Sequence, residues 1–353
     1  MGKRLALLCV VLLLVLAGVL GAVRWWQTSR QSDFQQALSV APAGAQRVTY
    51  TDWAGIRREL GADVGAGSST AAVAGFLDDA FEADLSPMSA LLGSAEAMHE
   101  EYGFSPATLD WELLSQSEEG AAVVMRLPES TDLEATEERL EALGYQRPEE
   151  DGGVWIGGVD LLPTIGTVTP ELQFLAIDAD RRLVVGSDTE GYLEQAMETV
   201  TGDAGPMTGL DPVIDAVAAD GGPLAAAVYD GPQACSALAM GSADEADQDH
   251  ARELIAAAGD VNPLTGFAMA VEPGLDVRVA MSFENEEQAR TNADTRAVLA
   301  AGPAPGQGGD FTDRFRVGKV SADGSVVTME LEPREGEYVL SDLTSGPVLF
   351  ATC

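Results

Sequence analysis

The sequence predicts an α+β protein in which one N-terminal transmembrane helix precedes antiparallel sheets with helices packed on one face. Three observations lead to this prediction. The run Leu5–Val23 carries no charged side chain and is about as long as a helix that crosses a bilayer core. Beyond it, short β-favouring segments occur in pairs, separated by turn sequences such as Glu118–Gly120 (EEG) and Glu272–Gly274 (EPG). Between these pairs lie helix-start patterns, in which a Ser or Thr is followed three residues later by Glu.

Basic and aromatic residues bracket the apolar run, as they do at the ends of many membrane helices. They are Lys3 and Arg4 before it, and Arg24, Trp25 and Trp26 after it. We expect residues 1–26 to be an uncleaved signal anchor. A cleaved signal peptide is the alternative, although Val19–Gly21 matches a cleavage site only in part. The expected location is the cell membrane, with a single pass and an extracytoplasmic C-terminal domain.

The charge balance restricts the partners of the protein. The chain of 353 residues has a formal net charge of −37, and residues 1–30 contain four bases and no acid. Such an acidic surface repels nucleic acid and anionic lipid headgroups, so we expect no nucleic-acid partner. Solubility explains the acidity without any binding site. The length is sufficient for one large domain or two ordinary ones.

The first half of the exported part begins after a stalk. Residues 27–46 are polar at first and then small and Pro-containing, which indicates a juxtamembrane stalk. Arg47–Thr51 alternates in polarity and predicts a strand, and Asp52 can cap the helix that follows. The later elements expected in this half are helices at 70–83, 86–102, 131–143 and 187–200, and strands at 109–115, 121–127, 154–156, 172–177 and 183–186.

The second half repeats much of this order. The elements expected are helices starting at 211 and 231 and helices at 242–258 and 285–300, a strand at 223–229, hairpins at 264–271 with 275–283 and at 311–320 with 326–331, and a short element at 337–343. Both halves contain a strand, an Asp-capped helix, a hairpin, a long helix and a second hairpin. We therefore expect a duplicated strand-helix-hairpin-helix-hairpin unit, with halves at 47–205 and 206–353.

One acidic run is the best candidate for a cation site. Asp244, Asp247 and Asp249 supply oxygen ligands of the kind that calcium prefers. The run lacks the Gly turn and the distal Glu of a loop-type calcium site. It also falls in the first turns of an expected helix, where acids complement the helix dipole. The helix-start interpretation is favoured, and calcium binding is the alternative.

Other chemistries lack the residues that they need. His99 and His250 are the only histidines, so a histidine metal site or catalytic triad has few partners. The glycine run Gly306–Gly309 lacks the lysine and the helix start of a phosphate-binding loop, and no dinucleotide fingerprint occurs. We therefore expect no cofactor and no nucleotide. Three tryptophans fall on core-facing or strand positions, which favours core packing over sugar stacking: Trp53, Trp111 and Trp155.

The cysteines predict one disulfide. Cys9 lies in the membrane segment, so Cys235 and Cys353 are the two that remain for an oxidising compartment. The bridge would fix the apolar C-terminal tail to the second half of the chain. Two buried free thiols are the alternative.

The overall layout resembles that of uncharacterised single-pass cell-envelope proteins of high-GC Gram-positive (actinobacterial) type. A short basic N-terminus, one anchor and an Ala-rich acidic remainder carry this resemblance, which implies no activity. We expect a non-catalytic binding, scaffold or assembly role, with another envelope protein as a candidate partner. The alternative is a carboxylate-dependent envelope hydrolase, assisted by calcium. Its catalytic residues cannot be singled out among 57 acids.

Overall fold

A computed structural model describes residues 32–150, 152–218 and 221–353. The expected membrane segment Leu5–Val23 lies outside these ranges. Within them, no helix is both long and apolar enough to cross a membrane.

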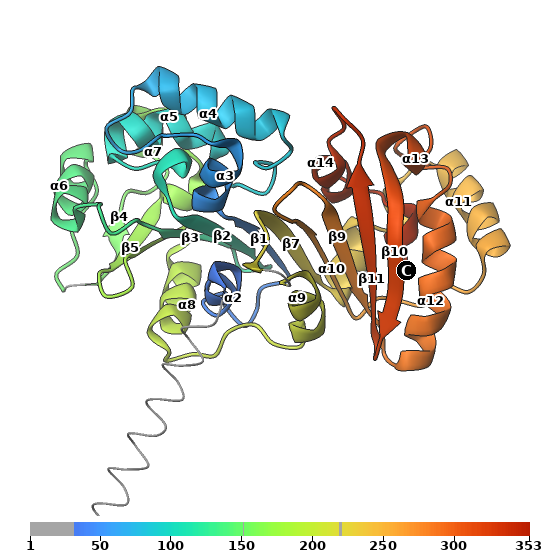
Figure 1. Ribbon diagram of the computed structural model, residues 1–353. Helices are drawn as coiled ribbons and strands as arrows, with labels where there is room; N and C mark the ends of the chain where they lie inside the picture. Colours follow the sequence, from blue (N-terminus) through green and yellow to red (C-terminus); the bar gives the residue numbers. More distant parts are fainter. Residues whose placement is uncertain (1–31, 151, 219–220) are drawn as a thin grey trace, which may run out of the picture.

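The described chain folds around one antiparallel sheet of eleven strands, in the order β10-β11-β9-β8-β7-β1-β2-β3-β6-β5-β4. The predicted α+β class is confirmed, with one continuous sheet instead of separate ones (Figure 1). The strands are β1 Arg47–Thr51, β2 Trp111–Gln116, β3 Ala121–Arg126, β4 Trp155–Ile156, β5 Phe174–Asp178, β6 Leu183–Ser187, β7 Ala225–Asp230, β8 Gly266–Val271, β9 Val277–Ser282, β10 Phe315–Asp323 and β11 Val326–Pro333.

The two halves of the chain meet at the centre of the sheet, where β1 pairs with β7. The register is symmetrical, because Arg47 lies opposite Tyr229 and Thr51 lies opposite Ala225. Outward from this pair, the first half runs β1-β2-β3-β6-β5 and the second runs β7-β8-β9-β11-β10. The strand order is therefore the same in both halves, apart from the short edge strand β4 that only the first half has.

Helices cover both faces of the sheet, whereas the sequence predicted helices on one face. The α4 face carries α3 Trp53–Leu60, α4 Thr70–Glu82, α5 Ala95–Ala97, α6 Leu133–Leu143, α7 Leu162–Ile165, α10 Gly231–Ala237, α11 Glu245–Ala258, α12 Glu286–Ala300, α13 Phe311–Arg314 and α14 Val339–Thr344. The α8 face carries α2 Asp33–Leu38, α8 Glu190–Thr201 and α9 Asp211–Val217. Each face of the sheet has its own apolar core, and successive residues of a strand point into different cores. For example, Leu113 packs on the α8 face and Leu114 on the α4 face.

Part of the expected stalk belongs to the folded body. Ser32 caps α2, and Phe34 and Leu38 are buried against the α8 face of the sheet. The Phe34 ring packs edge-on against Tyr50 of β1, with 5.2 Å between the ring centroids. Residues 32–46 are therefore part of the folded body, because their apolar side chains pack against this face of the sheet beside α8 and α9.

The C-terminal tail is fixed by the predicted disulfide. Cys235 of α10 and Cys353 are bonded, with 5.5 Å between their Cα atoms, so this prediction is confirmed. A buried arginine of α12 holds the same tail. Arg296 donates to the carbonyl oxygens of Phe350 at 2.6 Å and Asn262 at 2.7 Å, and burial lowers its pKa to about 9.

Candidate functional site

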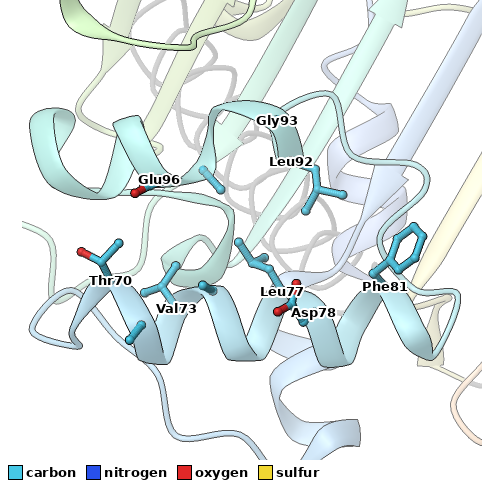
Figure 2. A pocket seen from close by; sticks show the side chains of 11 residues that line it. Thr70, Val73, Leu77, Asp78, Phe81, Leu92, Gly93 and Glu96 are labelled. Atoms are coloured by element: carbon cyan, nitrogen blue, oxygen red, sulfur yellow. The ribbon is translucent and has the colours of Figure 1, made fainter.

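A long apolar groove lies on the α4 face of the first half, between α4 and the segment that contains α5 (Figure 2). Its volume is about 640 Å³, within the range of ligand-binding clefts. The residues that line it are Thr70, Ala71, Val73, Ala74, Leu77, Asp78, Phe81, Leu92, Gly93, Ala95 and Glu96. The groove is the strongest candidate site in the described chain.

The first wall of the groove is α4 itself. Ser69 caps this helix by accepting a hydrogen bond from the Ala72 amide. The helix buries Phe76 and Ala80, and the Phe76 ring lies edge-on to Trp53 of α3, with 6.1 Å between the ring centroids. The groove-lining residues recur along α4 at spacings of three and four, which is the pattern of a face that packs against another helix. Val73 and Leu77 on this face are buried, whereas Ala71, Ala74 and Phe81 remain exposed along the groove.

The second wall departs from the prediction. A single helix was expected over residues 86–102, but the chain forms a 3₁₀ turn at Leu92–Ser94, then α5, then a π-helical turn at Met98–Tyr102. The physical reason is Glu112 of β2, whose carboxylate accepts hydrogen bonds from the Ala90 amide at 2.8 Å and from Ser89 Oγ at 2.9 Å. These bonds draw the backbone out of a helical path just before the wall begins.

Glu112 is fully buried and also accepts a bond from Trp53 Nε1 at 2.8 Å. Burial raises its pKa to about 7, while the donated hydrogen bonds oppose the rise. The carboxylate does not line the groove. Its role is to position the second wall over the sheet.

The far end of the groove reaches the second half of the protein. Phe81 is 50% exposed, and its ring lies 5.6 Å from the ring of Tyr338. Asp84 follows in a left-handed conformation (φ 56°) and accepts hydrogen bonds from the Leu340 amide at 2.6 Å and Ser341 Oγ at 2.5 Å. Asp84 thereby caps the start of α14 from outside that helix, and burial raises the pKa of its carboxyl.

The charges at the groove are all of one sign. Asp78 on α4 and Glu96 on α5 are its only charged lining residues, and they come from opposite walls (Figure 2). Neither appears in an ion pair among the described residues. A smaller hollow of about 230 Å³ shares Glu96 and adds Glu100 and Glu101. The groove therefore combines an apolar floor with an acidic rim.

The acidic run that was the candidate cation site does not converge. Asp244 caps α11 by accepting a hydrogen bond from the Asp247 amide at 2.9 Å. Asp249 pairs with Arg252 of the same helix. In residues 32–150, 152–218 and 221–353, no three His, Cys, Asp or Glu side chains come close enough to hold a metal ion. The structure therefore gives these acids helix-start and surface roles.

The other residues considered from sequence occupy structural positions. His99 contacts the Ser68 carbonyl oxygen at 2.8 Å, and His250 is exposed on α11. In the glycine run, the carbonyl oxygens of Gln307 and Gly308 accept hydrogen bonds from the Arg314 guanidinium group. The loop therefore binds a basic side chain of the protein through its carbonyl oxygens. The three tryptophans considered for sugar stacking, Trp53, Trp111 and Trp155, are all buried.

Comparisons with known proteins give no functional lead. No protein-family model matches the chain, and no curated protein matches it. Among solved structures, crystal form I of TP0453 is 10% identical over 91% of this chain and 99% of that one, with a TM-score of 0.43. Crystal form III of TP0453 is 10% identical over 88% and 98%, with a TM-score of 0.39. Likeness at this level carries no argument about function.

Sequence reasoning missed the groove. A signal for it is present in α4, where exposed Ala71 and Ala74 lie on the same helix as the exposed aromatic Phe81. An apolar outer surface on a helix whose inner surface is also apolar indicates a second contact.

Proposed function

We propose that this protein is a membrane-tethered, extracytoplasmic binding protein without catalytic activity, which docks a segment of another envelope protein in the α4–α5 groove. The observation that supports this best is an open apolar groove with a half-exposed phenylalanine at one end. Open apolar surface of this kind on a folded protein is typical of an interaction site.

The path of the chain supports the orientation. The described chain enters the fold at α2, on the face of the sheet opposite to α4 (Figure 1). An anchor at residues 1–26 would therefore place the groove on the side that faces away from the membrane. In that position it is accessible to a partner anchored elsewhere in the envelope.

The shared strand order of the two halves supports a duplicated architecture. In this proposal residues 47–205 and 206–353 are two copies of one unit, joined through β1 and β7. The joined sheet then serves as a rigid platform for the groove, because rigid elements hold a binding site more firmly than loops do.

Two variants of α4 test the groove. Ala74 lines the groove, whereas the exposed Ala72, on the same helix, does not. Full-length protein in phosphatidylcholine nanodiscs is mixed with a fluorescent helical peptide that carries a leucine stripe and uncharged glutamine flanks. We expect binding to the native protein and to Ala72→Trp, and loss of binding in Ala74→Trp, because the indole fills the groove. No binding to any of the proteins, or equal binding to both variants, would contradict the proposal.

A protease tests the location. Added to intact protoplasts, it should degrade the domain beyond residue 31. Protection of the domain in intact protoplasts, with degradation after lysis, would reverse the orientation.

A further inference from the structure

The shape of the groove specifies the form of its ligand. Thr70, Ala74 and Phe81 mark one face of α4 over about 16 Å, which is three turns of helix. Small side chains along this face let another backbone approach closely, and the spacing of three and four is the one on which a second helix packs. The opposite wall, which includes Leu92, supplies the other side of a trough along which an amphipathic helix can lie.

The rim of the groove specifies the charge of that ligand. Asp78 projects from the α4 wall and Glu96 from the facing wall, so a helix in the trough has one carboxylate on each flank (Figure 2). No basic side chain lines either this groove or the adjoining hollow with Glu100 and Glu101. The chain as a whole has a net charge of −37, which favours the approach of cations and opposes the approach of anions.

We infer that the α4–α5 groove binds a basic amphipathic helix, with an apolar stripe against Ala74 and Phe81 and lysine or arginine side chains against Asp78 and Glu96. This inference rests on the proposed function and names the chemical class of the partner segment. The apolar contacts supply most of the affinity, and the two acids select the sign of the charges beside the stripe.

Three peptides of about 18 residues with the same leucine stripe test the charge selection. Their flanks carry lysine, glutamine or glutamate. Affinities are measured by fluorescence anisotropy, at low salt, with full-length protein in phosphatidylcholine nanodiscs, and empty nanodiscs provide the background. We expect the lysine peptide to bind about fivefold more tightly than the glutamine peptide and the glutamate peptide to bind most weakly, since two rim ion pairs contribute modestly.

A matched pair of double variants separates the effect of the two rim carboxylates from that of the net negative charge of the whole protein. Asp78→Asn with Glu96→Gln removes the two rim acids, and Glu194→Gln with Glu198→Gln removes two exposed acids of α8 on the opposite face. The first double variant should abolish most of the lysine preference, and the second should retain it.

Equal loss in both double variants, or equal affinity for the lysine and glutamine peptides, would overturn the basic-helix inference. Binding of the glutamine peptide would in that case still support the groove as a binding site. Groove-dependent dimers of the protein itself, lost in Ala74→Trp, would also overturn the inference, because the occupant would be a second copy of the chain.

Discussion

Replacing Glu112 with glutamine should remove a large part of the pH dependence of stability between pH 4.5 and 8. The carboxylate is fully buried on β2, where Trp53, Ser89 and Ala90 donate hydrogen bonds to it. Burial raises its pKa from the ordinary value of 4.5 to about 7. Between pH 4.5 and about 7 the folded protein holds a proton on Glu112 that the unfolded chain has released.

The sign and the size of the effect follow from this shift. Because the folded state binds more protons than the unfolded state between pH 4.5 and 7, the free energy of unfolding falls as the pH rises through this range. Above the folded pKa of about 7, the contribution of Glu112 to the free energy of unfolding no longer changes with pH. A shift of this size corresponds to about 3 kcal/mol, at about 1.4 kcal/mol for each pKa unit. Burial also raises the pKa values of Asp52, Asp84 and Asp110, so the wild-type curve contains their contributions as well.

The comparison with Glu112→Gln isolates the one group. Glutamine stays neutral at every pH. Its amide nitrogen faces either the Ala90 amide or Trp53 Nε1, so one donor loses its acceptor, which costs about 1–3 kcal/mol at all pH values. Urea unfolding followed by tryptophan fluorescence, on a version of the chain that begins at Ser32, gives both curves. The stability advantage of the wild type should shrink by about 3 kcal/mol from pH 4.5 to pH 8. A constant difference across that range would refute the reasoning, and Glu118→Gln, in an exposed turn, serves as the control.

The remaining predictions concern the C-terminal tail and the contact between the halves. Replacing Cys235 and Cys353 with serine should cost up to about 4–5 kcal/mol in urea unfolding, because the bridge closes a loop with a sequence separation of 118, whereas reductant should then have no further effect. Arg296→Met should cost about 2–4 kcal/mol by the same assay, because it leaves the buried carbonyl oxygen of Phe350 and the half-buried one of Asn262 without their donor; a cost below 1 kcal/mol would contradict this. Asp84→Ala should cost about 1–3 kcal/mol and Asp84→Asn less, since asparagine keeps an acceptor for the Leu340 amide and tolerates the left-handed backbone; equal costs would argue against the cap.

Local signals in the sequence were sufficient for most elements. The strand at Arg47–Thr51 and the cap at Asp52 lie where the sequence predicted them, and the hairpin turns at EEG and EPG join β2 to β3 and β8 to β9. These features depend on residues within a few positions of one another, through turn chemistry and capping. The cysteine pairing was also predictable, because assigning Cys9 to the expected membrane segment leaves only one pair.

Features that depend on distant contacts were missed. The helix expected over residues 86–102 breaks because Glu112, far along the chain, takes hydrogen bonds from Ser89 and Ala90. The sequence does contain one signal that helices cover both faces of the sheet. The strand Ala121–Arg126 is apolar at five successive positions, which is typical of strands buried on both sides, whereas a strand with one exposed face alternates. Of the helices that cover the second face, α8 and α9 lie where the sequence predicted helices, and α2 lies in the segment that was expected to be a stalk.

The groove lies where the two halves differ most. In the second half, the strand β7 leads through the Asp230-capped α10 and then α11 directly to β8. In the first half, β1 leads through the Asp52-capped α3 and then α4, but residues 84–110 intervene before β2. This extra segment, absent from the second half, is the one that forms the facing wall of the groove. In the proposed duplicated unit, the elements that both halves share build the sheet. The facing wall of the proposed binding site comes from the segment that only the first half has. Comparing the order of elements in the two halves therefore predicts the fold but not the site.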